Sequence, residues 1–145
     1  MRTPMRQMFD SLKNLGDDTA LEEMVFELYA PEALFQDPLQ KARGRKEILK
    51  MYQDLARIFP DMSAELISEA CDGDTHVAEW SMTFRSRLWP KAVTIDGTTW
   101  LDLDKHGLIL AHRDYWDLWQ FLRRALPIPG ALLDRIPEPL RHLLD

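Results

Sequence analysis

The N-terminal part of the chain places apolar side chains at helical spacing. Apolar residues recur every three or four positions over residues 5–15, 21–28 and 48–59, and this period predicts three amphipathic helices. Thr19 and Glu22 form a capping box at the start of the second helix. A residue that ends helices follows each run, in the order Gly16, Pro31 and Pro60.

From residue 62 the apolar period changes to two. Met62, Ala64 and Leu66 alternate with Ser63 and Glu65, which is typical of a strand with one buried face. Similar runs cover residues 75–88, 92–103 and 108–116, separated by Asp72-Gly73-Asp74, Trp89-Pro90-Lys91 and Asp104-Lys105-His106-Gly107. We expect Asp96-Gly97 to form a bulge or an additional turn.

Helices followed by a long antiparallel meander are typical of an α+β fold. A strongly twisted meander can curl around the helices as an open cone and leave an internal pocket at its wide end. We expect one domain over residues 1–125, ending in a short helix after Asp117. A tail over residues 126–145 is rich in proline and should carry a short amphipathic helix.

Composition and charge narrow the class of protein. A chain of 145 residues, 46% of them hydrophobic, can bury about two-thirds of its unfolded surface without metal or disulfide. A net charge of −6 without a basic and aromatic stripe excludes a nucleic-acid binder. No apolar run approaches the roughly 18 residues of a membrane span. Cys71 is the single cysteine and the N-terminus is too charged for a secretory signal, so we expect a cytoplasmic protein.

Residue spacing indicates neither a metal site nor a cofactor. His, Cys and carboxylate residues do not occur at the usual spacing of metal ligands, and a Gly-rich phosphate loop is missing. His76 and His106 lie in or near predicted turns, so we do not expect either in the site. The expected cofactor and metal content is therefore none.

Two segments resemble a known superfamily. Residues 29–38, which end in the pair Asp37-Pro38, and the helix that contains Tyr52 resemble the front half of bacterial ketosteroid isomerases and SnoaL-like polyketide cyclases. Residues 100–107 and 112–117 resemble the back half of those families and of limonene epoxide hydrolases. The resemblance covers roughly residues 5–125, and it implies a cone of the nuclear transport factor 2-like type, also called cystatin-like, with an internal pocket.

The resemblance to ketosteroid isomerases implies that Asp37 is the base that moves a proton between carbons. An apolar pocket would desolvate this carboxylate and make it a stronger base. Phe9 occupies the position that resembles the family's oxyanion tyrosine, and Thr99 lies near that of its protonated aspartic acid. Tyr29 and Tyr52 match two supporting tyrosines of the family.

The resemblance to epoxide hydrolases places Asp114 on a catalytic carboxylate of that family. His112, Asp114 and Trp116 alternate along one predicted strand, so they share one face. The second aspartate and the arginine of that family should lie near residues 79–83, where this chain has Glu79 and Ser81. Glu79 or His112 beside Asp114 remains an alternative arrangement.

The strand around Trp80 leaves two orientations open. Alternation favours Trp80, Met82 and Phe84 facing inward, whereas the family register places the polar set around Glu79 toward the pocket. If the apolar set lies outside with Trp100 and Tyr115, a second copy of the chain would cover that face of the sheet. The expected partners are a small hydrophobic molecule and a second copy in a homodimer.

Three functions follow in order of preference. The first is proton transfer on a small hydrophobic carbonyl compound by an isomerase, cyclase or dehydratase, and the second is non-catalytic binding of such a molecule. Epoxide hydrolysis is the third. The expected catalytic residues are Asp37, Asp114 and His112. The expected substrate contacts share the predicted pocket: Phe9, Tyr29, Phe35, Tyr52, Glu79, Thr99, Leu101 and Trp116.

Overall fold

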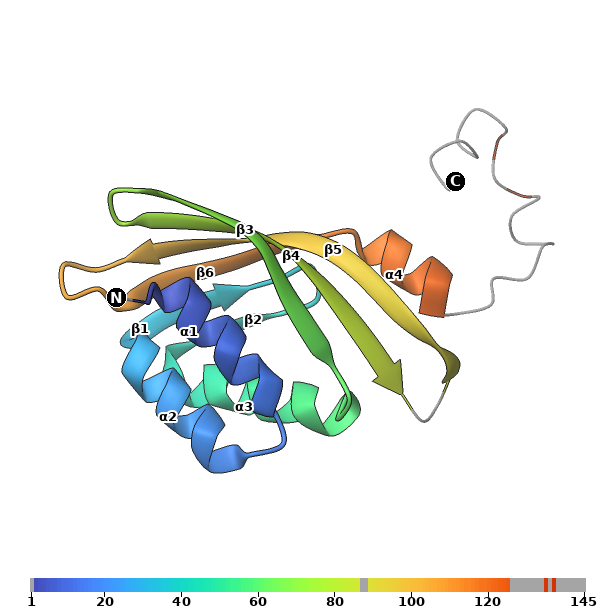
Figure 1. Cartoon of the computed structure of the whole chain (residues 1–145), viewed down its shortest axis with the longest axis horizontal. Coiled ribbons are helices and arrows are strands. Elements are labelled where there is room, and N and C mark those ends of the chain that lie inside the picture. Colours follow the sequence, from blue (N-terminus) through green and yellow to red (C-terminus); the bar gives the residue numbers. More distant parts are fainter. Residues whose placement is uncertain (1, 87–88, 126–134, 136, 138–145) are drawn as a thin grey trace.

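The computed structural model describes residues 2–86 and 89–125, together with positions 135 and 137. Three helices cover one side of a curved six-stranded sheet, and a fourth helix follows the last strand (Figure 1). This arrangement confirms the predicted α+β cone. The helix expected in the tail over residues 126–145 lies outside the described residues, apart from positions 135 and 137.

The first two helices follow the predicted apolar runs. Helix α1 spans Pro4–Ser11 and continues into a short 3₁₀ turn, η1, over Leu12–Asn14. Helix α2 spans Asp18–Leu28, and it begins earlier than the expected capping box because Asp17 is its N-cap. The Asp17 carboxylate accepts hydrogen bonds from the N–H groups of Thr19 and Ala20, which satisfies two of the unpaired donors of the first turn.

Helix α3 spans Gly44–Ile58, as the sequence predicts. Its apolar stripe buries Ile48, Met51 and Tyr52 against the sheet and α2. Helix α4 spans Leu118–Ala125 and packs against β5. Both helices carry their apolar face toward the core, as amphipathic surface helices do.

Two strands precede α3 that the sequence analysis missed. Strand β1 spans Tyr29–Gln36 and strand β2 spans Lys41–Arg43. Pro31 lies in an irregular stretch of β1, where the pairing with β6 shifts between Tyr29 and Leu34. A proline is tolerated there because it has no N–H to contribute to the ladder.

The remaining strands form the predicted meander, except that Trp89-Pro90-Lys91, expected to separate two strands, lies at the start of β5. They are β3 (Ser63–Asp72), β4 (Thr75–Ser86), β5 (Trp89–Leu103) and β6 (Ile109–Trp116). The strand order is β2-β1-β6-β5-β4-β3, with β1 parallel to β6 and every other neighbouring pair antiparallel. The parallel pair joins the helical half of the chain to the end of the meander.

The burial of side chains along β4, which lies between β3 and β5, settles which of them face the core. Trp80 and Phe84 are buried, Met82 is half-buried against the core, and Glu79 is exposed. The apolar set therefore lies inward, as simple alternation favours. Trp100 and Tyr115 are exposed on the outer face, and the homodimer expected there stays a prediction.

A bulge in β3 breaks the alternation that the sequence predicts. Leu66 pairs with Trp80 and Ser68 pairs with Glu79, so one extra residue is inserted at Ile67. A bulge of this kind moves every later side chain of the strand to the opposite face. Glu69 and Cys71 are thereby turned to the inner face of the sheet.

Gly97 permits close packing at the centre of the sheet. Strand β5 runs without interruption through Asp96 and Gly97, which pair with Ser81 and Trp80, so the expected bulge or turn there is wrong. A Cβ atom on Gly97 would lie 2.4 Å from Cη2 of Trp80 and 2.9 Å from the carbonyl oxygen of Tyr115. The Trp80 indole therefore occupies the space that any other residue at position 97 would need.

We expect Gly97→Ala to destabilise the fold by about 1–3 kcal/mol, because the indole must leave its place over β5. The free energy of unfolding in urea measures the effect. Gly16→Ala is the matched control, since a Cβ atom at Gly16 meets nothing within 4 Å, and it should cause no loss. Equal stability of the two variants would contradict the packing role of Gly97.

No helix among the described residues is both long and apolar enough to cross a lipid bilayer.

Candidate active site

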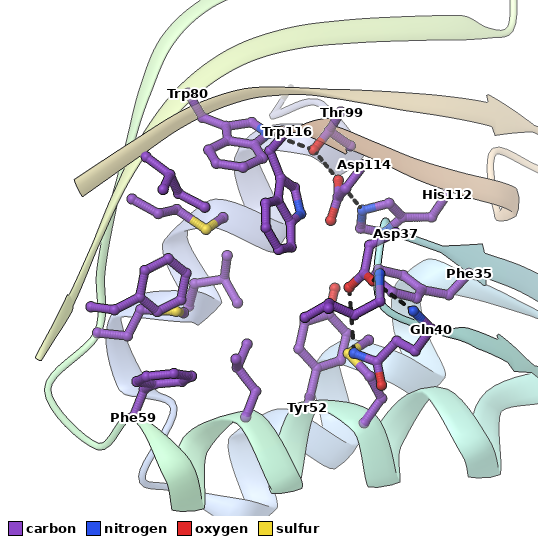
Figure 2. Close-up of a pocket in the computed structure, with 18 of the residues that line it drawn as sticks. Phe35, Asp37, Gln40, Tyr52, Phe59, Trp80, Thr99, His112, Asp114 and Trp116 are labelled. Carbon is purple, nitrogen blue, oxygen red and sulfur yellow. Dashed lines mark hydrogen bonds and ion pairs between the residues drawn. The ribbon is translucent and has the colours of Figure 1, made fainter. Parts of the chain in front are cut away.

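An internal cavity lies between the concave face of the sheet and helices α1 and α3 (Figure 2). Its volume is about 120 Å³, and most of its lining is apolar. Helix α1 contributes Met8 and Phe9, helix α3 contributes Met51 and Tyr52, and the exposed Leu39 lies on the β1–β2 loop at the mouth. The polar side chains of the lining are few: Asp37, Gln40, Tyr52, Thr99, His112 and Asp114.

One chain of hydrogen bonds links the buried polar groups. The hydroxyl oxygens of Tyr52 and Tyr29 are 2.8 Å apart, and the Tyr29 hydroxyl is 2.7 Å from Nδ1 of His112. Nε2 of His112 is 2.8 Å from Oδ1 of Asp114. On the other side, Oγ1 of Thr99 lies 2.5 Å from the same Oδ1.

The donors and acceptors along this series of hydrogen bonds determine the direction in which the protons are donated. The Trp80 indole N–H can only donate, and it donates to Oγ1 of Thr99 at 2.8 Å, so the Thr99 proton is free for the Asp114 carboxylate. With Asp114 ionised and His112 neutral, the imidazole donates through Nε2 and accepts the Tyr29 proton at Nδ1. Every hydrogen bond then donates toward Oδ1 of Asp114.

The second carboxylate oxygen of Asp114 is left for a ligand. Oδ2 has no hydrogen-bond partner among the described residues, and Asp114 lines the cavity. The Asp114 side chain is 15% exposed and that of His112 only 3%. The arrangement fixes the carboxylate rigidly while one oxygen remains available.

Burial keeps Tyr29 and Tyr52, the two tyrosines in this series of hydrogen bonds, protonated. It raises the pKa of Tyr29 well above its usual value of 10.0, and the nearby Tyr52 and Asp114 raise it further. Burial also raises the pKa of Tyr52, although the hydrogen bond with Tyr29 partly offsets the effect. Both groups are neutral phenols over the physiological pH range and hold the imidazole of His112 in place.

Asp37 lies at the mouth of the cavity rather than in the hydrogen-bonded chain. Its Oδ1 accepts hydrogen bonds from the backbone N–H groups of Leu39 and Gln40 at 2.7 and 2.9 Å. Its Oδ2 has one longer contact, 3.4 Å to the side-chain amide of Gln40. The side chain therefore lines the cavity and also holds the turn between β1 and β2.

The structure separates the expected substrate contacts into three groups. Phe9, Phe35, Tyr52, Thr99 and Trp116 line the cavity, as do Asp37, His112 and Asp114. Tyr29 and Leu101 are fully buried and are not among the lining residues. The expectation that Glu79 contacts the substrate is wrong, because Glu79 does not line the cavity. It is exposed on the outer face, where its carboxylate lies 3.4 Å from the Ser68 hydroxyl.

Trp80 is a site residue that the sequence analysis did not select. Its indole lines the cavity and donates to Thr99. The alternation of apolar residues around it was a signal for inward placement, but its N–H partner lies on a neighbouring strand. Only the pairing of β4 with β5 identifies that partner.

Comparison with protein families identifies the domain. The model of the SnoaL-like domain family matches residues 5–112. The chain belongs to the SnoaL-like family. No curated protein sequence matches it. The family assignment confirms the expected resemblance and covers β1 and α3 together with most of the meander.

Solved structures agree with the SnoaL-like fold. An NTF2-like protein of unknown function from Exiguobacterium has a TM-score of 0.70 at 20% identity, with 80% of this chain and 99% of that chain covered. A putative isomerase of the SnoaL-like family from Agrobacterium tumefaciens has a TM-score of 0.67 at 20% identity, covering 79% and 94%. An LEH-like epoxide hydrolase from M. tuberculosis has a TM-score of 0.68 at 14% identity, covering 84% and 81%. At these identities the similarity is one of fold.

Proposed function

We propose that this SnoaL-like protein is a cofactor-independent enzyme that moves a proton on a small hydrophobic carbonyl compound, with Asp114 as the base. The observation that carries the proposal is the Asp114 carboxylate, which has one oxygen held by Thr99 and His112 and the other open to an apolar cavity. A carboxylate placed in this way is desolvated on the side from which a substrate approaches.

The arrangement supports Asp114 as base more strongly than Asp37. Oδ1 of Asp37 serves the β1–β2 turn through two backbone N–H groups, and its side chain lies at the mouth. Asp114 lies deeper in the cavity, and its supporting groups come from three strands and one helix. Asp37 is then a second polar contact for the part of the substrate nearest the solvent.

Trp116 supplies a donor for the substrate oxygen. It lines the cavity two residues after Asp114 on the same face of β6, and its ring N–H has no hydrogen-bond partner among the described residues. Figure 2 shows its ring beside Asp114. An N–H group positioned near a developing enolate oxygen stabilises the charge that forms there.

The proposed reaction needs no further reactant. Oδ2 of Asp114 takes a proton from the carbon next to the carbonyl group, and the electron pair of that C–H bond forms the enolate. Trp116 donates its hydrogen bond to the enolate oxygen. In a β,γ-unsaturated compound the enolate is a dienolate, so the protonated Asp114 can return the proton to the γ-carbon, which yields the conjugated isomer and restores the carboxylate.

The cavity limits the size of the substrate. An apolar cavity of roughly 150 Å³ accommodates benzene, so about 120 Å³ holds one ring or a short branched chain. A larger molecule would extend past Leu39 at the mouth. The substrate class that fits best is a compound with a single ring, or a larger compound that inserts one ring.

Epoxide hydrolysis is less well supported. The described part of the cavity lining contains no arginine, and Arg113 instead pairs with Asp102 at 2.6 Å. The residues of β4 that line the cavity are Trp80, Met82 and Phe84, so a second carboxylate does not face Asp114 from that strand. Non-catalytic binding of an apolar molecule remains the second candidate, because the apolar lining alone would serve it.

Hydrogen exchange at carbon tests the proposal directly. The wild-type protein would be incubated in deuterated water with cyclic ketones and enones of one, two and three rings, and deuterium uptake next to the carbonyl group followed by NMR. We expect accelerated exchange that is fastest for single-ring compounds. Binding of these compounds without faster exchange for any of them would favour the non-catalytic alternative.

A further inference from the structure

A second cluster of reactive side chains lies away from the cavity, at the turn between β3 and β4. In Figure 1 this turn is at the end of the sheet opposite α4. Cys71 pairs directly with His76 across the two strands, and Glu69 precedes Cys71 by two residues on the same strand. The bulge at Ile67 brings Glu69 and Cys71 to the inner face, where His76 also lies.

The three ligand atoms are close together. Sγ of Cys71 is 3.2 Å from Nδ1 of His76, and Oε1 of Glu69 is 3.8 Å from the same nitrogen. One atom from each side chain lies within 4.8 Å of both others. Bond lengths to zinc of about 2.0–2.3 Å in a tetrahedron place ligand atoms roughly 3.3–3.6 Å apart, so small side-chain rotations would close the site around an ion.

An independent observation at Glu69 also points to a cation. Its side chain is only 6% exposed, and Oε1 accepts no hydrogen bond although it is buried. Its other oxygen, Oε2, is 3.0 Å from Nε of Arg6 on α1, which holds the carboxylate in place. A buried carboxylate oxygen without a partner is costly, and a cation beside it would remove that cost.

We propose that Glu69, Cys71 and His76 form a binding site for a divalent transition-metal ion of the zinc class, with an exogenous fourth ligand. Thiolate, imidazole and carboxylate are all ordinary zinc ligands, and the thiolate disfavours hard ions such as magnesium or calcium. The exposed Cys71 leaves one side of the site open to water.

The ion would also change the charge balance of the cluster. Partial desolvation and the nearby Glu69 carboxylate raise the pKa of the Cys71 thiol above its usual value. A bound cation reverses this effect, because metal coordination deprotonates a thiol.

The proposed role is to join three elements at this end of the sheet. The ion links β3 to β4, and the contact between Glu69 and Arg6 extends the link to α1. None of the three side chains lines the cavity. The site would therefore stabilise the fold without taking part in the chemistry at Asp114.

Cobalt and zinc titrations test the site on the intact chain. After treatment with a chelator, we expect wild type to bind one Zn²⁺ per chain. Co²⁺ should give the thiolate-to-metal charge-transfer band that only a bound cysteine produces. Cys71 is the single cysteine, so this band assigns the site without any variant. Binding of the metal without the band would overturn the proposal, as would no binding.

Variants test each ligand separately. We expect Cys71→Ser and His76→Gln to weaken zinc binding at least about 100-fold, since partners that only orient a ligand already contribute about 10–100-fold. Glu69→Gln should weaken it at least about 10-fold. His106→Gln, at an exposed histidine in another turn, should bind like wild type. Circular dichroism would confirm that each variant is folded. If His76→Gln and His106→Gln weaken zinc binding equally, or if neither weakens it, the assignment of the ligands is contradicted.

Discussion

Asp114→Asn should lower the rate of carbon-proton exchange by about 10²- to 10⁴-fold, the usual contribution of a positioned general base. Asparagine has nearly the same shape, and its amide oxygen can still accept the hydrogen bonds that Thr99 and His112 donate to Oδ1. The variant therefore removes the proton acceptor while it keeps the surrounding network. The measurement is deuterium uptake by the best substrate of the wild type, together with the dissociation constant of that substrate.

Asp37→Asn is the matched control for this prediction. The amide oxygen of asparagine can still accept from the N–H groups of Leu39 and Gln40, so the turn at the mouth should persist. We expect less than a 10-fold loss of rate, since Asp37 is not the base. A loss in Asp37→Asn that exceeds the loss in Asp114→Asn would exchange the roles of the two carboxylates.

The buried tyrosine pair should make the protein sensitive to alkali. Burial raises the pKa of both Tyr29 and Tyr52 above the value of 10.0 that applies in the unfolded chain. Above about pH 10 the unfolded chain loses protons that the folded chain keeps, so stability falls as pH rises further and is fully present below that value. Each tyrosine contributes a slope of about 1.4 kcal/mol per pH unit, or about 3 kcal/mol per unit for the pair.

Urea unfolding between pH 9 and pH 12 measures this slope. Tyr52→Phe should remove about half of it, because one of the two buried hydroxyl groups is gone. Tyr115→Phe is the control, since Tyr115 is the exposed tyrosine of the chain, and it should leave the slope unchanged. A wild-type slope no steeper than that of Tyr52→Phe would show that the pair does not resist ionisation.

Much of the fold could be predicted from local sequence patterns. The stripe of α3 and the alternation in β4, β5 and β6 are local, and each is confirmed. Strands β1 and β2 were missed for a physical reason. Strand β2 has only three residues, and β1 contains Pro31 and takes its register from residues about 80 positions away along the chain, such as Ile109.

The residue types of the site could be predicted from the sequence, but the hydrogen bonds between them could not. Asp114, His112 and Trp116 share a face because of alternation, which the sequence shows. The bond between Tyr29 and His112 joins positions 83 residues apart and depends on the β1–β6 register. The cluster of Glu69, Cys71 and His76 was missed because the bulge at Ile67 brings Glu69 and Cys71 to the inner face, whereas strict alternation places them on the outer face.

The parallel pairing of β1 with β6 also has a consequence for how the chain reaches its native state. During synthesis, β1 emerges from the ribosome long before β6, the strand with which it pairs. Until β6 is made, the edge of β1 and the apolar side chain of Phe35 remain unpaired and exposed to solvent. Contacts between distant positions are slow to form, and an unpaired strand edge invites association with other chains. Premature termination before residue 109 should therefore yield aggregates, because β6, the last strand among the described residues, completes both the sheet and the candidate site.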